Sequence, residues 1–127
     1  MDIYLNGPIE IALDVIEFDE HLPSIKLRVG IVAEKFDGSI SVNTCCWVEC
    51  VVFDLFIESL KSGKDALFHD MSNGLSVSVS AEDHRMAWLY TSTDIDSNEM
   101  RAGSNEFLAD GDRERIISAF ENLPRWW

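Results

Sequence analysis

The sequence predicts an α+β domain in which a mostly antiparallel sheet of about six to seven strands, built from two hairpin or meander blocks, packs against two amphipathic helices. Strand-like segments come in hairpin runs, one helical stripe separates the two runs, and a second helical stripe closes the chain. Because strands do not alternate strictly with helices, an antiparallel sheet is favoured over a doubly wound parallel one. The length of 127 residues suits one domain, 1–127, with a core of its own.

The first third of the chain shows the period-two alternation of half-buried strands. Apolar and polar residues alternate over 9–15 and again over 25–31, on either side of a turn at 20–23. Asp37-Gly38 is a strong hairpin signal, and a third strand follows it over 40–44. This segment therefore predicts a three-stranded meander.

The hydrophobic period changes in the next segment. From Cys46 to Ser62 the apolar residues recur at i, i+3, i+4 and i+7, which predicts an amphipathic helix of about four turns. Thr44 is a candidate N-cap, and Gly63 suits the position just after the last turn. We expect the apolar stripe of this helix to lie on the sheet.

The second half of the chain returns to strand signals and ends in a helix. Asn73-Gly74 is a specific hairpin turn, and it precedes a strand over 75–80 with one apolar and one hydroxyl face. The polar stretch 92–105 is expected to be a loop. The remaining predictions are strands over 66–69, 86–91 and 106–109, and a final helix from Asp112 to Leu123, which Pro124 ends.

The charge is the outlying feature of the composition. With 23 acidic and 10 basic residues, the chain carries a net charge of -13. Such a surface repels the phosphates of nucleic acid and of an anionic membrane, and it favours a basic protein as partner. The alternative is that the charge only keeps the protein soluble, although a net charge of magnitude about 2–8 is enough for a small domain.

Targeting signals and cysteine usage indicate a compartment. The N-terminus lacks the basic and apolar regions of a signal peptide, and no apolar stretch approaches the roughly 20 residues that span a bilayer. The three cysteines, Cys45, Cys46 and Cys50, do not form a disulfide framework. We therefore expect a cytoplasmic protein with reduced thiols.

Motifs that carry chemistry are missing from the sequence. It contains no G-x-S-x-G elbow, H-E-x-x-H pair, P-loop or G-x-G-x-x-G run. Cys46 and Cys50 are spaced i, i+4 but lack a second pair of ligands, so they are expected to be packed thiols. Asp94-x-Asp96-x-Asn98 has the spacing of a calcium loop without its glycine and closing glutamate. The sequence thus predicts a protein that is not an enzyme, with no catalytic residue, metal or cofactor.

Loop carboxylates and the aromatic C-terminus are the candidate partner-binding residues. Binding residues tend to lie on loops, and tryptophan is enriched among the residues that dominate binding energy. For each acid the alternative is a solvated surface, and for the tryptophans it is closure of the core against the sheet. The candidates are Asp19, Glu20, Glu82, Asp83, Asp94, Asp96, Glu99, Glu106, Trp126 and Trp127.

The order of elements resembles a group of small bacterial proteins. The residues that carry the resemblance are Trp47-Val48, Leu55-Phe56, Leu60, Gly63, Leu67-Phe68, Asn73 to Val77, and Phe120 to Leu123. In this order they look like immunity proteins of polymorphic toxin systems, including the WapI-type and contact-dependent growth inhibition immunity proteins. The resemblance implies a cytoplasmic protein that binds and neutralises a cognate toxin domain, often a basic nuclease. It carries over no catalytic residue, and it assigns no interface.

Two other classes of function stay open at the level of sequence. One is an acidic regulatory or adaptor domain that binds another cytosolic protein without catalysis. The other is an enzyme or small-molecule sensor, because a sheet covered by helices can contain an apolar pocket. A well-formed pocket with convergent polar groups would favour that last class.

Overall fold

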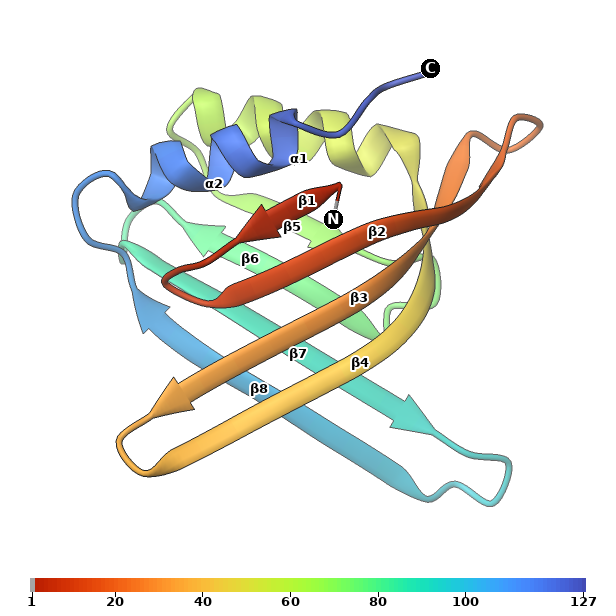
Figure 1. The fold of residues 1–127 in the computed structure, drawn as a ribbon, viewed down its shortest axis with the longest axis horizontal. Helices are drawn as coiled ribbons and strands as arrows, with labels where there is room; N and C mark the ends of the chain where they lie inside the picture. The colour runs from red at the N-terminus through yellow and green to blue at the C-terminus, as the bar shows by residue number, and fades with distance from the viewer. Residues whose placement is uncertain (1) are drawn as a thin grey trace.

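The computed structural model describes residues 2–127 and shows two four-stranded antiparallel sheets and two helices (Figure 1). The N-terminal sheet has the order β1-β2-β3-β4, and the C-terminal sheet has the order β5-β6-β7-β8. Each sheet is followed in the chain by one helix, so the two halves share the same order of elements. The elements are β1 (Ile3–Leu5), β2 (Glu10–Asp19), β3 (Ser24–Lys35), β4 (Gly38–Glu49), α1 (Cys50–Lys61), β5 (Ala66–His69), β6 (Leu75–Ser80), β7 (Arg85–Thr93), β8 (Glu99–Phe107) and α2 (Asp112–Glu121).

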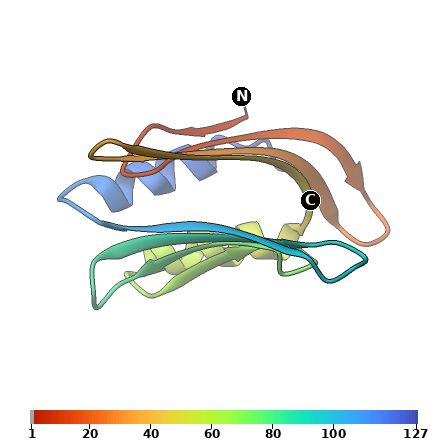
Figure 2. The same ribbon diagram turned by 90° about the horizontal axis from the view of Figure 1, so that it is seen from below.

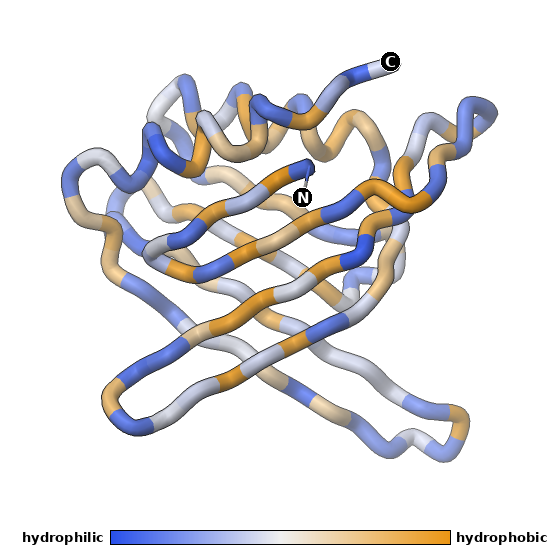
Figure 3. Tube along the Cα trace, in the orientation of Figure 1, coloured by the Kyte–Doolittle hydropathy of each residue, from blue (hydrophilic) through white to orange (hydrophobic). Residues whose placement is uncertain are grey.

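The predicted α+β class with antiparallel strands is confirmed, but the strands form two sheets instead of one sheet of six to seven. Figure 2 shows the sheets as two facing layers, with both helices along one side of the pair. The period-two alternation of β2 and β3 (Figure 3) determines which face of each strand is buried. It does not determine whether two hairpin blocks share a ladder or face each other, and this is why one sheet was predicted.

The helices close one side of the core. α1 follows the N-terminal sheet yet packs along β5, and α2 follows the C-terminal sheet yet packs along β1. Where the helices meet, four buried phenylalanines contact one another with ring centroids 4.8 to 5.8 Å apart. They are Phe53, Phe56, Phe68 and Phe120. The inward faces of both sheets join this cluster in one hydrophobic core.

Three element boundaries differ from the sequence prediction. Thr44 is not an N-cap, because β4 stays paired with β3 as far as Glu49 and α1 begins only at Cys50. The polar stretch 92–105 is mostly strand, since β7 extends to Thr93 and β8 begins at Glu99. The first block has a fourth strand, β1, which pairs with only three residues of β2. Over the polar stretch, pairing between β7 and β8 outweighs local polarity.

Candidate functional site

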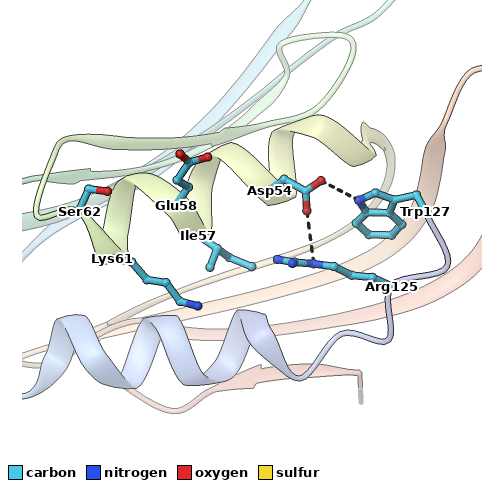
Figure 4. Close-up of a pocket in the computed structure, with 7 residues that line it drawn as sticks. All are labelled: Asp54, Ile57, Glu58, Lys61, Ser62, Arg125 and Trp127. Carbon is cyan, nitrogen blue, oxygen red and sulfur yellow. Dashed lines mark hydrogen bonds and ion pairs between the residues drawn. The ribbon is translucent and has the colours of Figure 1, made fainter.

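The tail that follows α2 is fastened to α1 by one carboxylate (Figure 4). Trp127 Nε1 donates a hydrogen bond of 2.9 Å to Asp54 Oδ2, and Arg125 Nε lies 3.3 Å from Asp54 Oδ1. These side chains border an open hollow of about 450 Å³ between α1 and the tail. Because the residues on both sides of Trp126 are anchored, the position of Trp126 is also constrained.

A row of aromatic contacts connects the core with the surface. The ring of the fully buried Phe53 lies 6.1 Å from that of Trp127, which lies 5.6 Å from Trp126. Trp126 in turn lies 5.1 Å from Phe18 of β2. Phe18 is 56% exposed and Trp126 is 41% exposed. The outer two members of the row therefore present a supported aromatic surface to solvent.

A β-bulge shapes the end of β2 beside this surface. The register with β3 shifts between Val15 and Glu17, so Ile16 has no partner in the ladder and its side chain is exposed. Bulges increase the local twist of a strand and redirect its side chains. β1 pairs with β2 only over 11–13, so this part of β2 has no other strand beside it. On the side of β2 away from β3, the ring of Phe18 therefore packs against Trp126 of the tail.

Two acidic residues, Asp19 and Glu20, directly follow Phe18 at the end of β2. Asp19 Oδ1 accepts hydrogen bonds from the backbone amides of His21 and Leu22, at 2.9 and 3.4 Å, while Glu20 is exposed. The amide of Cys50 donates to the Pro23 carbonyl at 2.8 Å and so ties this turn to the start of α1. We call Phe18, Asp19, Glu20 and Trp126 the aromatic–acidic patch.

The other predicted acids lie elsewhere. Glu82 and Asp83 are exposed in the turn between β6 and β7, and Asp96 is exposed in the loop between β7 and β8. Glu99 lies 2.5 Å from Arg101 on the same strand. Figure 1 places these two turns at opposite ends of the C-terminal sheet, away from the turn after β2. Among the ten predicted residues, the structure groups only Asp19 and Glu20 with the two terminal tryptophans.

Asp94 organises its own loop. Its Oδ1 accepts hydrogen bonds of 2.9 Å from the backbone amides of Asp96 and Asn98, and its Oδ2 accepts one of 3.0 Å from Asn98 Nδ2. The hydrogen bond from the Asn98 side chain, with the backbone bonds, holds the pKa of Asp94 below its ordinary value. Both carboxylate oxygens therefore serve the loop conformation.

Glu106 is not an exposed loop acid, which corrects the sequence prediction. It lies on β8 with only 6% of its surface exposed, and its carboxylate is 2.6 Å from Lys35 Nζ of β3. Its ladder partner is the buried Met86, so both side chains are on the face between the sheets. Glu106 links the two sheets, and it is buried because its side chain, like that of its ladder partner Met86, lies on the face toward the other sheet.

A second hollow, of about 280 Å³, opens between β4, β7 and the turn after β5. Asp70 lines it, 6% exposed, and its Oδ1 accepts the Leu75 amide at 3.0 Å. Burial, with smaller contributions from Asp70 and Cys45, raises the pKa of Cys46 to about 12. The Cys46 thiol is therefore protonated at neutral pH and is a weak nucleophile. The carboxylate, meanwhile, stabilises the hairpin between β5 and β6.

The described residues, 2–127, show no cluster of metal-ligating side chains and no helix of membrane-spanning length. No three His, Cys, Asp or Glu side chains in that range come close enough together to hold a metal ion. No described helix is long and apolar enough to cross a membrane. The chain matches no family model, no curated protein and no solved structure.

Two residues of the site were missed from the sequence, Phe18 and Asp54. The adjacent apolar residues Val15-Ile16 break the alternation of β2, and this break is a signal for the bulge that positions Phe18. Asp54 lies among helix residues spaced for burial and gives no sign that it binds the tail. Only the tertiary fold brings Asp54 to Trp127, 73 positions along the chain.

Proposed function

We propose that this chain is a cytoplasmic, non-catalytic immunity protein that binds and neutralises a basic toxin domain of the nuclease class that the sequence resemblance implies. The aromatic–acidic patch carries the proposal. Its two supported, half-exposed rings meet at the end of β2, where Asp19 and Glu20 follow Phe18, on a chain whose net charge is -13. Aromatic anchors beside charge are typical of the residues that dominate binding energy.

The charges and the rings have different roles in this proposal. Acids distributed over the surface attract a basic partner from a distance and raise the association rate. The rings of Phe18 and Trp126 bury apolar surface in the complex and slow dissociation. The row of contacts down to Phe53 limits the side-chain ordering that binding requires, because both rings are already packed.

Growth rescue tests the proposal. The chain is co-expressed with a candidate basic toxin domain that stops growth when it is expressed alone. We expect the wild-type chain to restore growth and the Phe18→Ala/Trp126→Ala variant to lose most of the rescue. Phe36→Ala/Ile95→Ala is the matched control, because both residues are almost fully exposed at hairpin tips away from the patch. Cell death at high levels of the wild-type chain would refute the proposal.

A further inference from the structure

The two sheets have four edge strands, and one of them is unprotected. α2 packs along β1 and α1 packs along β5, so helices cover these two edges. β4 and β8 form the margin on the other side of the molecule (Figure 1). β8 carries Glu99, Arg101 and Glu106, whereas β4 has no charged residue from Gly38 to Val48. Proteins commonly protect an edge with charge, proline, a bulge or a covering element. Residues 38–43 of β4 have no charge, proline or bulge, whereas the turn after β5 lies beside Trp47 and borders a hollow with Cys45.

The backbone of β4 shows which groups lie on the free edge. The Trp47 carbonyl accepts the Met71 amide at 2.8 Å, so it points away from β3. The register between β3 and β4 is continuous, and alternate residues of a strand direct their backbone groups to the same side. The N–H and C=O groups on the free edge therefore belong to Ser39, Ser41, Asn43 and Cys45. All four side chains are exposed.

We infer that the β4 edge pairs with the β4 edge of a second copy of this chain, in antiparallel orientation. Full overlap of the four free residues places Ser39 opposite Cys45 of the second copy and Ser41 opposite its Asn43. This register forms up to about eight backbone hydrogen bonds, since each hydrogen-bonded pair exchanges two. The two N-terminal sheets then become one continuous eight-stranded sheet across a two-fold axis.

The distribution of charge favours a second copy of this chain as the partner of this edge. Most surfaces of a chain with a net charge of -13 would bring acids together on self-association. Pairing of two β4 edges brings no acids opposite each other in any register, because β4 is uncharged from Gly38 to Val48. The basic residues Lys26 and Arg28 lie on the neighbouring strand. A basic partner would be attracted to the acidic surfaces instead of this edge. Phe18 pairs with Ile25, which pairs with Val48, so the aromatic–acidic patch lies two strands from the end of β4. The patch shares no residue with the pairing proposed over 39–45.

Sedimentation velocity of the full chain tests the inference. From about 5 to about 500 µM, which spans weak to moderate affinities, we expect conversion to a species of twice the 14.4 kDa of one chain. Ser41→Asp/Asn43→Asp places carboxylates opposite each other across the two-fold axis and should weaken dimerisation at least tenfold, because like charges directly opposite are destabilising. Asn105→Asp/Ser118→Asp, with the same substitutions at exposed positions on β8 and α2, should dimerise like the wild type.

Cross-linking tests the register separately. Hydrogen-bonded antiparallel partners have Cα atoms about 5.5 Å apart, a separation that disulfides accept. Ser39→Cys places a thiol opposite Cys45 of the second copy, and oxidised glutathione should convert this variant to a covalent dimer. Ser39→Cys/Cys45→Ser should stay uncrosslinked under the same conditions.

Each result either supports or overturns the inference. A wild-type chain that is monomeric at the highest concentration overturns it. So does a dimer that survives Ser41→Asp/Asn43→Asp while circular dichroism shows that variant to be folded. If the aspartate variant does not fold, cross-linking of Ser39→Cys decides alone, and its absence overturns the register. Growth rescue by a monomeric variant would leave the proposed function intact.

Discussion

Removal of the Asp54 carboxylate should release the C-terminal tail from α1. In Asp54→Ala, the indole of Trp127 loses its acceptor at 2.9 Å and Arg125 loses its partner at 3.3 Å. With neither anchor, Trp126 is no longer held against Phe18. We therefore expect lower stability together with a loss of order in the aromatic–acidic patch.

The size of the effect follows from the two contacts. A hydrogen bond to a charged acceptor contributes about 1.5–3 kcal/mol. The ion pair adds about 0–1 kcal/mol, because the Arg125 and Asp54 side chains are 39% and 42% exposed. Water reaches Asp54 and reduces the first figure, so we expect the free energy of unfolding to fall by about 1–2 kcal/mol.

Urea unfolding and NMR measure the two consequences separately. The chain has four tryptophans, so a proton–nitrogen correlation spectrum contains four indole signals. In Asp54→Ala the Trp127 indole signal, assigned with Trp127→Phe, should shift and exchange faster with solvent. Glu58→Ala is the matched control, because Glu58 lies one turn further along α1 and borders the same hollow, and its side chain makes no hydrogen bond or ion pair with other described residues. An unchanged Trp127 signal with unchanged stability would refute the account of the tail.

Three further predictions concern buried and titrating groups. Lys35→Ala leaves the buried Glu106 unpaired and should lower the free energy of unfolding by about 1–3 kcal/mol in urea titrations, and equal stability would contradict the link between the sheets. Iodoacetamide at neutral pH should label the exposed Cys45 well before Cys46, whose pKa is about 12; mass spectrometry of digests reads the order. Because the folded pKa of Asp94 is lowered, its contribution to stability is present above its ordinary pKa of about 4 and is lost as pH falls through the folded value. NMR titration should place Asp94 below that ordinary value, and a value above it would contradict the loop geometry.

Local patterns account for much of the fold and little of the site. Alternation correctly indicates the buried face of β2 and β3, and the helical stripe correctly places most of α1. The same patterns do not reveal that the strand continues through Thr44, because the apolar residues of Thr44–Val48 fit both the strand period and the helix period. Partition of the strands into two sheets depends on contacts between segments far apart in the chain.

For the candidate site too, the sequence indicates single residues but not the contacts that bring them together. Asp19 and Glu20 were predicted from their turn, and the two tryptophans from their position after Pro124. Nothing in the sequence brings these segments together, because Asp54 and Phe18 do so through tertiary contacts. The burial of Glu106 was missed for a related reason, since it depends on the other sheet, which lies against this face of β8 and contributes Lys35.

Binding kinetics with the purified toxin domain test the central claim most directly. If acids steer the encounter and the rings hold the complex, the association rate should fall at least about tenfold between roughly 50 and 500 mM salt. Phe18→Ala/Trp126→Ala should then raise the dissociation rate and leave the association rate nearly unchanged. An association rate that does not depend on salt, or a dissociation rate that the variant does not change, would contradict the account.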